Sequence, residues 1–131
     1  MVVVLLHNIR SSHNVGSIFR TADASGVKKI YLCGITPLPK DKYGKPNQKL
    51  VKVSLGAEKS VEFEKVKSTQ TLISRFKKEG YKILALEQDK KSQNLFKFKP
   101  KEKINYVLIL GEEKRGLPGS ILRKSDKILE I

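Results

Sequence analysis

Residues 8–26, NIRSSHNVGSIFRTADASG, combine side-chain types that can bind and orient a polar ligand. Asn14 is a good N-cap residue and Gly26 suits the end of a helix, so this segment predicts a polar loop followed by a helix. Arg20 lies outside the predicted apolar face of that helix, which comprises Val15, Ile18, Phe19 and Ala22. A loop that opens onto a helix directs free backbone N–H groups toward a ligand, so the segment is a candidate binding site.

Two further polar loops follow apolar segments, ALEQD at 85–89 and GEEKRGLP at 111–118. Gly111 and Gly116 allow the backbone to approach a ligand closely. In an open α/β sheet, ligands bind beyond the carboxyl ends of the strands. All three loops follow predicted strands, so we expect them to meet at one edge of the sheet.

The elements that must position these loops alternate between strands and helices. Continuous apolar runs predict strands of a parallel sheet at residues 2–6, 29–33, 81–86 and 106–110, with a fifth at 127–131. Helices are predicted after Asn14, at 68–79 and around 120–123, with a helical turn in 52–58. The first strand, helix and strand form a βαβ unit. The expected fold class is therefore α/β, a mostly parallel sheet with helices on both faces.

Positive charge dominates the composition. The chain has 27 Lys and Arg against 13 Asp and Glu, a net charge of +14, with an isoelectric point near 9.9. Residues 40–103 hold 18 basic and 8 acidic side chains, which account for +10 of this charge. Such a chain is typical of nucleic-acid binders, and the alternative is a basic but unselective surface.

Aromatic residues occur among the lysines in two segments. Tyr43 lies in the predicted loop 34–47, where it could stack on a base while neighbouring lysines contact phosphate, or belong to a solvated loop. Phe96 and Phe98 alternate with lysines, which predicts a short edge strand with a basic outer face or, alternatively, an RNA contact.

Several familiar sites are excluded by their missing motifs. The sequence has no G-x-G-x-x-G, P-loop or G-x-S-x-G motif, and His7, His13 and Cys33 lack zinc-site spacing. A single cysteine excludes an internal disulfide and fits a reducing cytosol, so we expect a cytoplasmic protein. No apolar run approaches the ~20 residues of a membrane span.

Two segments resemble the motifs of a known family. NVGSIFRTADASGVKKIYL resembles the first motif, and ILGEEKRGLPGSIL the second motif, of the SpoU-type (TrmH-like) RNA 2′-O-ribose methyltransferases. The resemblance implies an α/β-knot (SPOUT) fold, a homodimer, S-adenosylmethionine as methyl donor, and tRNA or rRNA as substrate. Because the donor is already a cation, no metal is expected.

The resemblance also implies roles for individual residues. Arg20 matches the family's catalytic arginine, which would hold a phosphate and stabilise the developing alkoxide while phosphate or water takes the proton. Asn14 would orient the substrate or fix the loop, and Glu113 would pair with an arginine across the site. Cofactor-lining positions, used mostly through backbone, are Leu86, Gly111, Gly116 and Ile131. From charge and position, RNA contacts are expected at Arg10, Lys42, Lys45 and Lys49.

Alternatives from the residues alone stay open at this point. Arg20 could form an i,i+3 ion pair with Asp23 on a solvated helix face, and Asn14 could be only an N-cap. The chain as a whole could be a non-catalytic RNA-binding module derived from the same fold, or a basic RNA-binding domain of another fold.

The family's third motif would follow Ile131. Residues 1–131 are thus expected to form one SpoU-type domain, C-terminally truncated relative to the family, with an incomplete knot. On this expectation the chain alone is inactive and at best weakly dimeric.

Overall fold

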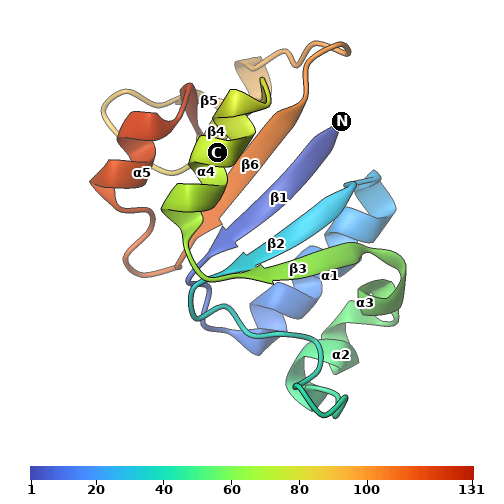
Figure 1. The fold of residues 1–131 in the computed structure, drawn as a ribbon. Helices are drawn as coiled ribbons and strands as arrows, with labels where there is room; N and C mark the ends of the chain where they lie inside the picture. Colours follow the sequence, from blue (N-terminus) through green and yellow to red (C-terminus); the bar gives the residue numbers. More distant parts are fainter.

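A computed structural model describes residues 1–131, which form a seven-stranded sheet with every strand parallel to its neighbours (Figure 1). The strand order is β3-β2-β1-β6-β4-β7-β5. The strands are β1 (Val2–His7), β2 (Lys29–Cys33), β3 (Glu62–Val66), β4 (Lys82–Leu86), β5 (Gln93–Asn94), β6 (Tyr106–Gly111) and β7 (Lys127–Glu130). The predicted parallel α/β architecture is confirmed.

Helices cover both faces of this sheet. They are α1 (Ser12–Ser25), α2 (Gln48–Ser54), α3 (Ala57–Ser60), α4 (Thr69–Lys78) and α5 (Gly119–Lys124), with a 3₁₀ turn, η1 (Leu95–Lys97). Alternate residues of β1 point to opposite faces, so Val3 and Leu5 pack with α4 and α5, while Val4 and Leu6 pack with the first three helices. The longest helix, α1, has 14 residues, and none of the helices combines the length and the hydropathy of a membrane span.

The first helix begins earlier than predicted. Its N-cap is Ser11, whose hydroxyl accepts a 3.1 Å hydrogen bond from the backbone N–H of Asn14. Asn14 therefore lies inside α1, and the prediction of Asn14 as the N-cap is wrong. Gly26 ends the helix as predicted, in the left-handed conformation at φ +76°.

Three predictions between the main strands need correction. The single helical turn predicted for 52–58 is two short helices, α2 and α3, separated by Leu55 and Gly56 in left-handed conformations. Strand β3 is absent from the prediction because its sequence, EFEKV, is mostly charged, as suits a sheet edge. Phe96 and Phe98 do not alternate along a strand, since residues 95–97 form η1. Phe98 instead packs edge-on against Tyr106.

Candidate functional site

Three loops meet where the order of the strands reverses. β1 and β6 are neighbours in the centre of the sheet, with His7 beside Gly111 at their carboxyl ends. The chain leaves β1 toward β2 on one side and leaves β6 toward β7 on the other. Such a switch point is where open α/β sheets bind ligands. The fold therefore brings the first and third predicted loops together, as expected.

Asn14 and Glu113 connect these two loops directly. The side-chain Nδ2 of Asn14 donates a 2.6 Å hydrogen bond to Glu113 Oε1. Because Ser11 caps α1, the Asn14 amide is free to make this contact. The expected pairing of Glu113 with an arginine does not occur: Arg10 Nε instead lies 4.0 Å from the neighbouring carboxylate, Glu112 Oε1.

A cavity of about 510 Å³ opens beside this contact, at the ends of β4 and β6. It is lined by Leu86, Glu87, Gln88, residues 111–117 and Leu122. Leu86, Gly111 and Gly116, three of the four expected cofactor positions, thus lie around one space. Ile131 does not line the cavity and is 80% exposed.

Glu87 shapes the wall of this cavity. Its Oε2 accepts a 2.7 Å hydrogen bond from the backbone N–H of Leu117. Gly116 has φ +63°, and a Cβ there would collide with the Glu87 carboxylate. A Cβ at Gly111 would lie 2.7 Å from Leu117 Cδ2. Gly111 is therefore confined by packing, since its Cβ would also lie 2.9 Å from the Gly116 backbone carbon, whereas glycine suits position 116 through its positive φ. Sequence reasoning missed Glu87 because its partner is a backbone group in a distant loop.

The residues around the cavity carry a small excess of negative charge. Three glutamates, Glu87, Glu112 and Glu113, line it together with Lys114 and Arg115, so the lining has a net charge of −1 and is called the acidic cavity. The volume falls within the ~300–1,000 Å³ usual for small-molecule sites. The cofactor that the resemblance implies, S-adenosylmethionine, is a sulfonium cation, which suits this small excess of negative charge.

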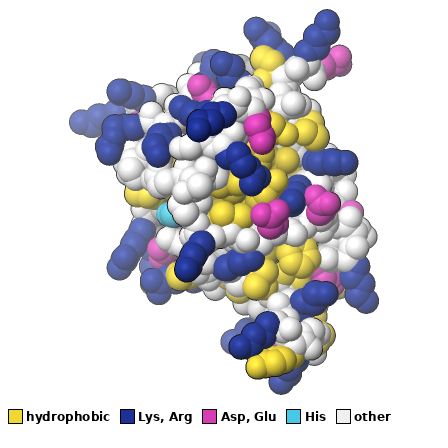
Figure 2. Space-filling view, in the orientation of Figure 1, with side chains coloured by type: hydrophobic (Ala, Val, Ile, Leu, Met, Phe, Trp, Pro, Cys, Tyr) yellow, Lys and Arg dark blue, Asp and Glu magenta, His cyan; other side chains and the backbone are white.

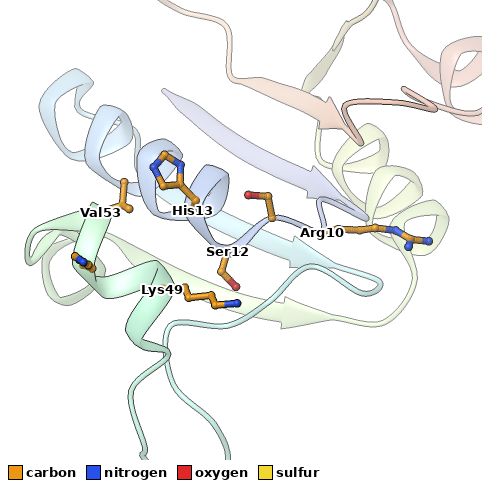
Figure 3. Close-up of a pocket in the computed structure, with 7 residues that line it drawn as sticks. Arg10, Ser12, His13, Lys49 and Val53 are labelled. Carbon is orange, nitrogen blue, oxygen red and sulfur yellow. The ribbon is translucent and has the colours of Figure 1, made fainter.

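A second, basic cavity of about 700 Å³ lies between the start of α1 and α2 (Figure 3). Figure 3 shows its residues coming from the loop before α1 and from α1 on one side, and from α2 on the other. They are Arg10, Ser11, Ser12, His13, Lys49, Lys52 and Val53, with no carboxylate among them. Arg10 and Lys49 were expected RNA contacts, whereas Lys52 and His13 were not.

Close packing of two helices creates this basic cavity. Gly16 of α1 lies against α2, where a Cβ would be 2.5 Å from the Leu50 carbonyl oxygen. Asn47 caps α2 and donates a 3.0 Å hydrogen bond from Nδ2 to Ser12 Oγ. The other expected RNA contacts, Lys42 and Lys45, lie in the turn that precedes α2.

Arg20 lies away from the Asn14–Glu113 contact. It is exposed on α1, six residues after Asn14, and therefore about 240° further around the helix. His13, seven residues before Arg20, shares its face, so this face of α1 runs from the basic cavity to Arg20. The structure contains no ion pair between Arg20 and Asp23.

His7 and Cys33 belong to the supporting structure beneath these loops. His7 Nδ1 lies 2.7 Å from Thr69 Oγ1, and burial lowers the pKa of His7. Burial likewise raises the pKa of the Cys33 thiol to about 11, so it is no nucleophile at neutral pH. Neither residue lines the acidic or the basic cavity.

The structure is thus an α/β protein with an all-parallel sheet, an acidic cavity at the ends of β4 and β6, and a basic cavity between the start of α1 and α2. The chain belongs to the SpoU rRNA Methylase family, whose model matches residues 1–131. The family resemblance carried by the two motifs is thereby confirmed.

Solved structures and named relatives agree with this family. The chain is similar to the AdoMet-bound rRNA methyltransferase of Sinorhizobium meliloti, with 27% identity, a TM-score of 0.86, and coverage of 99% of this chain and 46% of that one. The chain is also similar to the TrmH/SpoU tRNA modifying enzyme of Aquifex aeolicus, with 29% identity and a TM-score of 0.77. This match covers 98% of this chain and 60% of that one.

Among curated relatives, a tRNA (guanosine(18)-2′-O)-methyltransferase of Aquifex aeolicus is 29% identical over 134 residues. The match covers 99% of this chain and 57% of that protein. The chain spans about half the length of the curated relatives it matches.

Proposed function

We propose that this chain carries the catalytic domain of an S-adenosylmethionine-dependent methyltransferase that modifies the ribose 2′-hydroxyl of tRNA or rRNA. Family membership, the name of the Aquifex aeolicus relative and the cofactor of the Sinorhizobium meliloti structure support this proposal. The observation that carries it is the 2.6 Å Asn14–Glu113 hydrogen bond, because it joins the two loops that bear the family motifs.

The acidic cavity is the proposed cofactor site. Leu86, Gly111 and Gly116 would hold the cofactor through backbone groups, and Glu87 would keep the loop after β6 in shape. Ile131, which lies outside the cavity, is proposed as a cofactor contact on the resemblance alone. When bound, S-adenosylmethionine supplies an electrophilic methyl group.

The face of α1 that bears His13 and Arg20 is the proposed path of the RNA. Arg10 and Lys49 would bind backbone phosphates in the basic cavity, which extends the path toward Lys42 and Lys45. Since an arginine keeps its proton at neutral pH, Arg20 would not act as the base. Its planar guanidinium would hold a backbone phosphate. Because Arg20 lies away from the Asn14–Glu113 contact, its second role, stabilising the developing alkoxide of the target ribose, is proposed on the resemblance alone.

Asn14 and Glu113 are proposed to position the target nucleotide. The Glu113 carboxylate accepts one N–H of the Asn14 amide, which leaves the amide oxygen and the second N–H for the RNA. The 2′-hydroxyl proton would pass to a phosphate oxygen or to water. A homodimer is part of the same proposal, on the resemblance, and sedimentation equilibrium tests it.

Methyl transfer from tritium-labelled S-adenosylmethionine to tRNA and rRNA tests this function, with cofactor binding measured separately by calorimetry. A ribose-methylated product yields an alkali-stable dinucleotide, because the 2′-oxygen can no longer attack the neighbouring phosphate. Label in a base would contradict the proposed position. Binding of RNA without binding of cofactor would favour the non-catalytic module instead.

A further inference from the structure

A small closed turn projects from the molecule between β2 and α2, below α2 in Figure 1. The backbone N–H of Asp41 donates a 2.9 Å hydrogen bond to the Lys45 carbonyl, and that of Gly44 donates a 3.0 Å bond to the Asp41 carbonyl. Lys40 and Pro46 pair as an antiparallel bridge at its base. The turn formed by residues 40–46 therefore has a defined backbone of its own.

The side chain of Asp41 fixes this turn from inside. Its Oδ1 accepts hydrogen bonds from the backbone N–H groups of Tyr43, at 2.8 Å, and Lys45, at 2.9 Å. The only carboxylate of the turn is thus directed at its own backbone. None of the lysines at 40, 42 and 45 forms an ion pair.

Tyr43 stands at the tip of the turn with its ring in solvent. It is 83% exposed, whereas Tyr31 and Tyr106 are 6% and 7% exposed in the core. The Lys42 ammonium lies 5.2 Å from the centre of the Tyr43 ring. Figure 2 shows hydrophobic and basic side chains side by side at this tip. An ordered turn that holds an aromatic ring outside the core presents a ready surface for stacking.

Positive charge links the turn to the basic cavity. Residues 40–52 contain five lysines and one aspartate, a net charge of +4. Lys49 and Lys52, near the end of this segment, line the basic cavity, and Asn47 between them and the turn caps α2. A phosphate backbone that occupies the cavity can therefore continue along this segment to the turn.

We propose that Tyr43 stacks on an unpaired base of the RNA, while the lysines of the turn contact the phosphates on either side. This inference rests on the proposed RNA substrate and adds a specific contact outside the site of methyl transfer. Stacking suits this geometry because every base offers a flat face, and the turn is ordered before RNA binds.

The chain contains no tryptophan, so Tyr43→Trp places a single tryptophan at the tip of the turn, which can be excited separately from the three remaining tyrosines. Phe96→Trp is the matched control, since Phe96 is 81% exposed beside Lys97 at the other end of the sheet. Single-stranded oligoadenylate should quench the Tyr43→Trp fluorescence in a saturable way and leave Phe96→Trp unchanged. Inorganic polyphosphate, which has charge but no bases, should quench neither variant.

Affinity measured by anisotropy of labelled oligoadenylate gives a second readout. Tyr43→Ala should weaken binding on the order of tenfold, whereas Tyr43→Phe, which retains the ring, should bind as the unchanged chain does. Binding of oligoadenylate without quenching of Tyr43→Trp would overturn the stacking contact and leave the proposed function standing. Equal quenching by polyphosphate, or of Phe96→Trp, would also overturn it. Failure of the unchanged chain to bind any RNA at low salt would overturn both proposals.

Discussion

The Asn14 amide lies 2.6 Å from Glu113 Oε1, so one hydrogen bond joins residues 99 positions apart in the sequence. We expect Asn14→Ala and Glu113→Ala each to lower methyl transfer about 100-fold, because each leaves the target nucleotide without its positioning group. Because the contact is exposed, each substitution should lower the free energy of unfolding by only about 1 kcal/mol. The double variant should lose no more activity than either single variant, and fully additive losses would contradict a shared role.

Replacement of Arg20 should separate catalysis from stability. In a version that also carries the family's third motif, Arg20→Ala should lower methyl transfer by about 10²- to 10³-fold. The free energy of unfolding should stay within about 0.5 kcal/mol, because the side chain is exposed and has no ion pair. Arg20→Lys should lower methyl transfer as well, since the lysine ammonium lacks the planar, forked arrangement of donors that the guanidinium has. Thr21→Ala, at the neighbouring exposed position, is the control. Near-normal turnover by Arg20→Ala would contradict a catalytic role and indicate that Arg20 is a solvated surface residue.

RNA affinity should depend on salt through the basic segment before and within α2. The slope of log K against log salt is negative, and combined replacement of Lys42, Lys45 and Lys49 by Gln should make it shallower by about 2. This value assumes roughly 0.7 per lost phosphate contact with a single strand. The same change at Lys97, Lys99 and Lys101 removes equal charge near β5 and should leave the slope almost unchanged. Equal effects of the two triple variants would mean that RNA binds to the overall charge alone.

Gly116 and Gly80 offer a matched test of the cofactor loop. Both have positive φ, +63° and +87°, but a Cβ at Gly116 would collide with Glu87, whereas a Cβ at Gly80 has nothing within 4 Å. Gly80→Ala should cost about 1 kcal/mol in urea unfolding, from backbone strain alone. Gly116→Ala should lower the free energy of unfolding by more than Gly80→Ala does, and it should also weaken cofactor binding measured by calorimetry. Indistinguishable unfolding midpoints would show that the Glu87 carboxylate moves freely.

Protonation of His7 should lower the free energy of unfolding in mild acid. Burial holds its pKa below the usual 6.5, so folding favours the neutral ring beside Thr69. This contribution to the free energy of unfolding is complete above pH 6.5 and is lost as the pH falls through the lower folded-state pKa. Urea unfolding at pH 7.5 and 5.5 should show the loss, and His7→Gln should reduce it. By NMR, the His7 ring proton should titrate at lower pH in the folded chain than in urea.

Most of the fold follows from local patterns in the sequence. The apolar runs at 2–6, 29–33 and 106–110 predict β1, β2 and β6 almost residue for residue, because strands buried on both faces need continuous apolar side chains. Ser68 caps α4 as predicted. The charged strand β3 has no such pattern, since an edge strand has one side open to water.

Predictions for the site fail where distant residues decide the outcome. Ser11, Ser12 and Asn14 are all good capping residues. Ser11 is the one that caps α1, and the side chain of Asn14 instead donates a hydrogen bond to Glu113 in a distant loop. The basic cavity forms because α2 packs on Gly16, and no residue near Gly16 in the sequence predicts that contact. Local sequence therefore predicts which loops form the site but not which atoms meet there.

The central pair of strands has a consequence for how the chain folds. Val2 in β1 lies beside Tyr106 in β6, so the middle of the sheet is closed by segments from nearly opposite ends of the chain. Pairing of such remote segments has a large loop-closure entropy, and proteins rich in these contacts fold slowly. During synthesis, β1 must wait for β6 to leave the ribosome before its second edge is covered. Until then its unpaired hydrogen-bonding groups and apolar faces are open to other chains, a period in which a chaperone would limit aggregation.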